Sequence, residues 1–244
     1  MSNSSIFMRQ LFEHLYLGVI VTAVYIVVSP LLVERGYPGF GALLFVELFV
    51  LTPIVVAHLM YKAQKLNHSC SLNNIVLYRE KISVKRFGLW FVVGVVGITA
   101  VYVPLYPVGI LLRTEVFGWL PEWYFNPGYG ADDLTLLANL FLIGIVVDGI
   151  IGPVAEEFFF RGYLLPRMSY LKAWAPFVNG ALFGIYHFWQ PHNFVAIVVV
   201  GCVLSYIVWK TKNVYLGIAI HCTLNILGAV GGYLAVTGGV DLAR

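Results

Sequence analysis

Seven long runs of apolar residues constrain the fold of this chain more than any other feature. They lie at about residues 15–33, 40–61, 87–112, 134–165, 173–189, 194–209 and 214–236. A helix needs about 20 apolar residues to cross the hydrocarbon core of a bilayer. Inside that core only helices and closed barrels satisfy every backbone group, and these runs do not alternate as barrel strands do. The sequence therefore predicts an all-α bundle of about seven transmembrane helices.

The composition identifies the solvent and the partners of this bundle. Of the 244 residues, 60% are hydrophobic and 11% are charged, whereas charged residues make up about 25% of a soluble domain. So much apolar surface cannot be covered in water, and we expect the lipid bilayer as a partner. The formal charge of +3 is too small to indicate a nucleic-acid partner.

Two of the runs have features that bear on the span count. The run 134–165 exceeds one bilayer thickness, so we expect either a tilted helix bent near Gly152 and Pro153 or a span followed by an interfacial helix. The link from Gln190 to Asn193 is expected to form a turn between antiparallel helices. The first run continues to Val33 without a small-residue cleavage pattern, which predicts a retained membrane segment.

The distribution of basic residues predicts the orientation. With the N-terminus in the cytoplasm, only three of the 15 lysines and arginines lie on the outer side, namely Arg35, Arg113 and Arg244. This asymmetry obeys the positive-inside rule. We therefore expect a multi-pass integral membrane protein, with its N-terminus inside, in a bacterial or archaeal cytoplasmic membrane.

Ionisable residues inside the apolar runs are candidates for function, because each is costly at membrane depth unless paired or hydrated. Glu157 and Arg161 are four positions apart and can pair along one helix face, which leaves Glu156 pointing about 100° away around the axis. His221 and Asn225 also share one face of their run, and His187 shares its face with a phenylalanine.

The depths of these polar residues predict a common cavity. At about 1.5 Å per residue from the basic inner ends, Glu156 lies about 17 Å deep, His187 about 22 Å and His221 about 14 Å. Polar residues from three segments at similar depth indicate a water-containing pocket inside the membrane, nearer the cytoplasmic face.

Three motifs in this part of the sequence resemble those of a known family. The segments 155–161, 183–187 and 221–225 contain Glu-Glu-x-x-x-Arg, Phe-x-x-x-His and His-x-x-x-Asn. In this order on membrane segments they resemble the CAAX-protease and bacteriocin-processing (CPBP or Abi) family of intramembrane endopeptidases. The resemblance covers about residues 134–236, and it implies a catalytic core of four helices there. Residues 1–133 would then hold three further spans, and residues 237–244 a short tail.

The resemblance also implies an activity and a role for each site residue. The chain would hydrolyse a peptide bond of a membrane-associated protein or peptide near the cytoplasmic face. Glu156 would be the general base that activates water, and His187 would bind and orient that water. His221 and Asn225 would stabilise the oxyanion, as donors aimed at developing negative charge do in hydrolases. Glu157 and Arg161 would support Glu156.

Several alternatives stay open at this point. Glu156, His187 and His221 could ligate zinc with an activated water, although the His-Glu-x-x-His spacing of common zinc peptidases is absent. We therefore expect that no cofactor is required, with zinc as the alternative. A non-catalytic membrane scaffold or immunity protein, or a proton-coupled transporter, would also retain a polar cluster. For Glu47 and Asp148 we expect buried hydrogen bonds to neighbouring helices.

Overall fold

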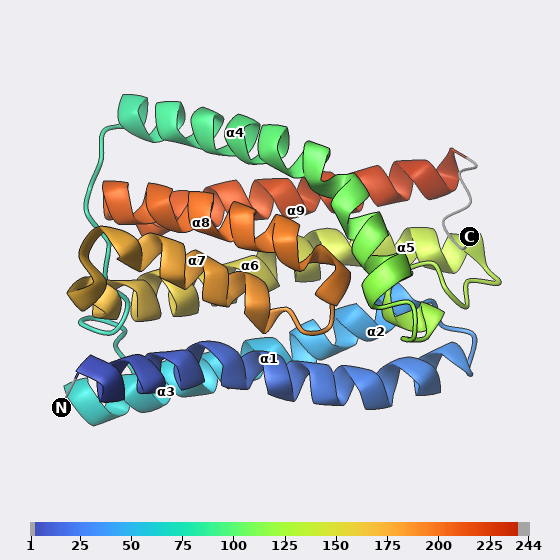
Figure 1. Cartoon of the computed structure of the whole chain (residues 1–244), viewed down its shortest axis with the longest axis horizontal. Helices are drawn as coiled ribbons and strands as arrows, with labels where there is room; N and C mark the ends of the chain where they lie inside the picture. Colours follow the sequence, from blue (N-terminus) through green and yellow to red (C-terminus); the bar gives the residue numbers. More distant parts are fainter. Residues whose placement is uncertain (1–2, 239–244) are drawn as a thin grey trace.

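The computed structural model describes residues 3–238, with side chains from residue 5 onward, so most of the predicted tail 237–244 lies outside the described residues. Every regular element in this range is a helix (Figure 1). Six helical stretches are long and apolar enough to cross a membrane: Ser5–Val33, Gly39–Asn67, Val84–Val116, Leu134–Tyr186, Pro191–Thr211 and Val214–Thr237. The predicted all-α membrane bundle is confirmed.

The fourth stretch folds back on itself and accounts for two of the predicted spans. Its outward leg consists of α5 (Leu134–Val146), η4 (Val147–Ile151), α6 (Gly152–Glu156) and η5 (Glu157–Leu164). The 3-10 segment η6 (Leu165–Trp174) then reverses the chain, with non-helical backbone at Met168 and Lys172. The return leg is α7 (Ala175–Tyr186), which runs antiparallel to the first (Figure 1). Counting both legs gives about seven passes, as predicted.

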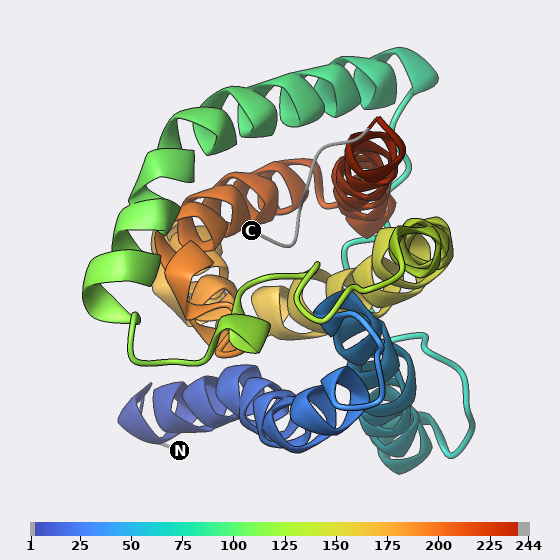
Figure 2. The same ribbon diagram turned by 90° about the vertical axis from the view of Figure 1, so that its right-hand side faces the viewer.

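The N-terminal half packs beside this core. It comprises α1 (Asn3–Val33), α2 (Gly39–Val46), η1 (Glu47–Leu51), α3 (Thr52–Asn67), α4 (Val84–Leu111), η2 (Leu112–Val116) and η3 (Glu122–Tyr124). Figure 2 shows α1 and the α2–α3 rod on one side of the bundle, and α4 curving around α8 (Phe194–Thr211) on another. Helix α4 bends along its length (Figure 1) and contains Pro104 and Pro107. Proline favours a bend because it removes a backbone donor and clashes with the preceding turn.

Three of the four π-helical segments among the described residues carry the acidic residues near the site. Glu47 opens η1, Asp148 is the second residue of η4, and Glu157 opens η5. A π-turn widens the helix, so the helix continues through Pro153. Of the two predicted forms of the 134–165 run, the structure therefore has a continuous helix, distorted around Gly152 and Pro153. Such turns often occur at functional sites.

Helix α7 is short and packs tightly on α8. The backbones approach most closely at Gly180, where an added Cβ would collide with the backbone at Cys202, and at Gly184, where it would collide with Val198. The predicted turn is present as η7 (Pro191–Asn193). Helix α7 ends part-way along the long axis of the bundle (Figure 1). His187, which follows its last residue, therefore lies in the interior.

Candidate active site

The structure brings two of the predicted site residues, His187 and His221, close to the carboxylate of a third, Glu156. His187 Nε2 lies 4.0 Å from Glu156 Oε1, and His221 Nε2 lies 3.8 Å from Oε2. Glu156 comes from the end of α6, His187 from the C-terminus of α7 and His221 from α9 (Val214–Thr237). Glu156 is only 7% exposed, so the predicted clustering of these side chains inside the bundle is what the structure shows.

Hydrogen bonds on the far side of each imidazole fix the orientation of both histidines. His187 Nδ1 lies 2.7 Å from the carbonyl oxygen of Phe183, and His221 Nδ1 lies 3.0 Å from Glu157 Oε1. A carbonyl and a carboxylate can only accept, so Nδ1–H is the donor in both contacts. In the neutral imidazole this leaves Nε2 as an acceptor, and both Nε2 atoms face Glu156.

Acceptors thus converge from three sides at distances too long for direct hydrogen bonds. Nε2 of His187, Nε2 of His221 and the Glu156 carboxylate all offer lone pairs to the same space. Such a set is stabilised by a donor placed among its members, and a water molecule with its two O–H groups meets that requirement. The arrangement is suited to holding and deprotonating water.

Glu157 and Arg161 form the ion pair that their spacing predicts. Arg161 Nη1 donates to Glu157 Oε1 at 2.9 Å, and both side chains are fully buried. The guanidinium also lies 3.9 Å from the centre of the Phe183 ring. Because Glu157 Oε1 is shared with His221, the pair acts on the cluster by orienting a histidine.

Gly217 makes room for this carboxylate. A Cβ added there would lie 2.7 Å from Glu157 Oε2, which has no hydrogen-bond partner among the described residues. Helix α9 can therefore approach the ion pair closely only because this position is a glycine.

Asn225 lies one turn beyond His221, but its contact is with a different element. Its Nδ2 donates to the backbone carbonyl of Asp148 in η4 at 2.9 Å. In a π-helix this carbonyl would pair with the N–H of residue 153, but Pro153 has none, so Asn225 takes its place and ties α9 to η4. The second N–H of the amide stays available for another acceptor.

Tyr186 is a site residue that the sequence motifs do not identify. It is fully buried, and its hydroxyl donates to Glu156 Oε1. The signal in the sequence is weak, because a tyrosine in an apolar helix is ordinarily a packing residue. Only its position directly before His187 could have singled it out.

A second feature missed by the motifs is a buried polar network behind the ion pair. Asn179 Nδ2 lies 3.0 Å from His14 Nε2, and Asn179 Oδ1 accepts from Ser205 Oγ at 2.9 Å. Ser205 Oγ in turn accepts from Arg161 Nε at 3.2 Å. These four residues and Glu157 are all fully buried. The network joins α1, α7 and α8 to the ion pair, and its members were detectable in the sequence only as isolated polar residues in apolar runs.

Glu47 adds a third acid near the site. Its Oε1 packs directly against Gly152, where any side chain would collide with it, and it lies within electrostatic reach of Asp148 and Glu156. Its Oε2 is buried without a hydrogen-bond partner among the described residues. The hydrogen bond to a neighbouring helix that we expected for Glu47 is therefore not found at this oxygen.

The sequence left zinc open as an alternative at Glu156, His187 and His221. Across residues 3–238 no group of three or more histidine, cysteine, aspartate or glutamate side chains has a metal-holding arrangement.

Comparison with known families agrees with this geometry. Residues 138–227 match a family described as Rce1-like, type II CAAX prenyl endopeptidase. The match covers less than half of the chain, and it relates this segment to that family. It supports the resemblance predicted from the three motifs, and the matched range contains every site residue predicted from them. No curated protein and no solved structure matches the chain.

The family and the fold together establish two coarse properties. Rce1-like proteins are a protease family, which relates the chain to peptidases. The six apolar helical stretches make the chain an integral, multi-pass membrane protein.

Proposed function

We propose that the chain is an intramembrane endopeptidase that hydrolyses a peptide bond of a membrane-associated protein or peptide, with water activated by Glu156. The observation that carries the proposal is the convergence of Glu156 with Nε2 of His187 and of His221, at 4.0 and 3.8 Å. A carboxylate in this position can take a proton from the water that the two imidazoles hold. The family match gives independent support for peptide hydrolysis.

The reaction would proceed in two steps. Glu156 takes a proton from water, and the water oxygen attacks the carbonyl carbon, which forms a tetrahedral oxyanion. The C–N bond then breaks, and the proton on Glu156 passes to the leaving nitrogen, which yields a carboxylic acid and an amine. The free N–H of Asn225 would donate to the oxyanion, and His221 Nε2 would do so while it holds the proton that Glu156 took from water, before that proton reaches the leaving nitrogen. Glu157 holds His221 in position for this role.

Substrate access is proposed from the side of the bundle that carries the basic loops. The closest chemical class is a peptide with a lipid-modified end, because the family is one of prenyl endopeptidases and the outer faces of the helices are apolar. We propose that catalysis needs no metal. Metal analysis of the purified chain, with cleavage measured before and after chelator treatment, tests this: loss of activity on chelation would contradict it.

A substitution at Glu156 tests the proposed function on whatever substrates the native membrane contains. Peptides and protein termini would be compared in membranes of cells that carry the wild-type chain, Glu156→Gln or Glu80→Gln, whose altered residue is an exposed loop acid. We expect one set of cleavage products to disappear in Glu156→Gln alone. An unchanged product set would overturn the proposal. A farnesylated peptide then tests the substrate class on the purified protein.

A further inference from the structure

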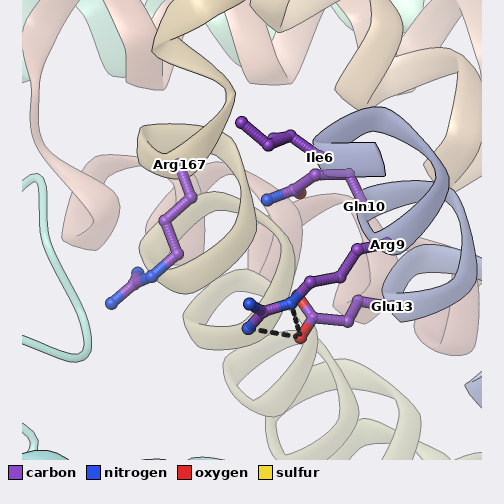
Figure 3. A pocket seen from close by; sticks show the side chains of 5 residues that line it. All are labelled: Ile6, Arg9, Gln10, Glu13 and Arg167. Atoms are coloured by element: carbon purple, nitrogen blue, oxygen red, sulfur yellow. Dashed lines mark hydrogen bonds and ion pairs between the residues drawn. The ribbon is translucent and has the colours of Figure 1, made fainter. Parts of the chain in front are cut away.

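A pocket lies beside the N-terminal end of α1, on the side of the bundle where the basic loops gather. It has a volume of about 270 Å³ and is lined by Ile6, Arg9, Gln10, Glu13 and Arg167. Figure 3 shows Ile6, Arg9, Gln10 and Glu13 of α1 on one side and Arg167 on the other. A water molecule occupies about 30 Å³, so the pocket has room for a small polar group of several heavy atoms.

Positive charge exceeds negative charge around this pocket. Glu13 Oε1 accepts from Arg9 at 3.2 Å and from Lys62 at 3.0 Å, and Arg167 lies on the opposite wall (Figure 3). One carboxylate therefore faces three basic groups. An anion in the pocket would restore the balance of charge.

Both arginines retain N–H groups for such an anion. Arg167 uses Nη1 and Nη2 to bind the carbonyls of Tyr163, Ile75 and Asn74, which fixes the guanidinium in place. Arg9 uses Nε and Nη2 for Glu13 and is otherwise half exposed, with 55% of its side chain accessible. A guanidinium offers five N–H groups, so neither one is exhausted by these contacts.

The surroundings indicate that this ligand comes from the membrane. The pocket lies at the first turns of a membrane-spanning helix, and Phe7, Met8 and Phe12 on the same turns are exposed on its outer face. The pocket thus lies at the level where the headgroups of the surrounding lipids meet the protein.

We propose that this pocket binds the headgroup of an anionic phospholipid. The phosphate contacts Arg9 and Arg167. This site is separate from the catalytic residues, so its test does not depend on the proposed function.

Native mass spectrometry of the whole chain in uncharged detergent tests the proposal with three probes: phosphatidylglycerol, phosphatidylcholine with the same acyl chains, and soluble glycerol phosphate. We expect phosphatidylglycerol to be retained about ten-fold more than phosphatidylcholine, from the two guanidinium contacts. Equal retention of the two lipids would overturn the proposal. If the protein bound glycerol phosphate but not phosphatidylglycerol, the ligand would be a soluble phosphate and not a membrane lipid.

Variants locate the site. Arg9→Gln should lose the preference for phosphatidylglycerol, while Lys85→Gln and Arg86→Gln, exposed basic residues outside the pocket, should keep it. Arg167 also holds the neighbouring loop, so Arg9→Gln is the decisive variant if Arg167→Gln fails to fold. An unchanged preference in Arg9→Gln, or an equal loss in the two controls, would refute the assignment.

Discussion

At the scale of single residues, the site depends on which atom of each side chain faces Glu156. The backbone carbonyl of Phe183 and the carboxylate of Glu157 hold the Nδ1 atoms of His187 and His221. Their Nε2 atoms are thereby presented to the same carboxylate. A substitution that leaves the histidines in place but removes one of these orienting contacts should therefore lower activity.

Tyr186→Phe tests the role of the hydroxyl that donates to Glu156. A hydrogen bond to a charged group contributes about 1.5–3 kcal/mol, so we expect the cleavage rate to fall about 10- to 100-fold while the protein stays folded. The rate would be measured on the substrate found with the Glu156→Gln comparison. Tyr206→Phe, on the exposed face of α8, is the matched control. An unchanged rate in Tyr186→Phe would show that the hydroxyl only packs.

Ser205→Ala tests the buried network behind the ion pair. The change leaves Arg161 Nε and Asn179 Oδ1 without their partner, and an unsatisfied buried group costs about 1–3 kcal/mol. We expect a lower unfolding temperature in detergent and slower cleavage, because Arg161 holds Glu157. Thr223→Ala removes a hydroxyl that bonds only within its own helix and should change both values little. Equal stability of the two variants would argue against the network.

At the scale of elements, the close approach of α1 to the end of α7 positions Tyr186 and His187. Gly18 of α1 lies directly against the Tyr186 carbonyl, and an added Cβ would collide with it. Helix α1 thus contacts the part of α7 that carries the site, although it contributes no residue to the predicted catalytic set.

Gly18→Ala should accordingly destabilise the protein and displace α7, at a cost of about 1–3 kcal/mol for overpacking. Gly97→Ala in α4 is the matched control, because nothing lies within 4 Å of the added Cβ and alanine favours a helix by about 1 kcal/mol over glycine. The unfolding temperature in detergent should therefore fall in Gly18→Ala and rise in Gly97→Ala. A stable, fully active Gly18→Ala variant would contradict the contact.

At the scale of the whole molecule, the ends of the helices divide into a basic side and a side with few basic residues. The N-terminus, the loop after α3, the turn η6 and the link before α9 lie at one end of the bundle (Figure 1). The positive-inside rule would place this end in the cytoplasm, together with the proposed headgroup pocket.

Thiol labelling tests this orientation. Cys70 is exposed in the loop after α3, so a membrane-impermeant maleimide should label it in inverted vesicles and not in intact cells. A Cys70→Ser, Asp132→Cys variant moves an exposed thiol to the opposite end and should label in intact cells. The reverse pattern would mean that the N-terminus lies outside.

The sequence by itself determined the membrane bundle, the motif residues and the Glu157–Arg161 pair. Apolar length and spacing along one helix are local properties, and they survive any packing arrangement. The same spacing placed Glu156 on a different face from Glu157, and the structure agrees.

Only the tertiary structure decided how the helices meet at the site. Tyr186, Ser205 and Gly18 act through partners that lie far away in the sequence, and no spacing along a single helix identifies such contacts. The turn at η6 and the three π-turns also decide which atoms converge, because they set where a helix ends and how far its side chains rotate. The positions of the acids along their helices could thus be read from the nearby sequence. The contacts that would give them a function arise from packing between segments that are far apart in the sequence.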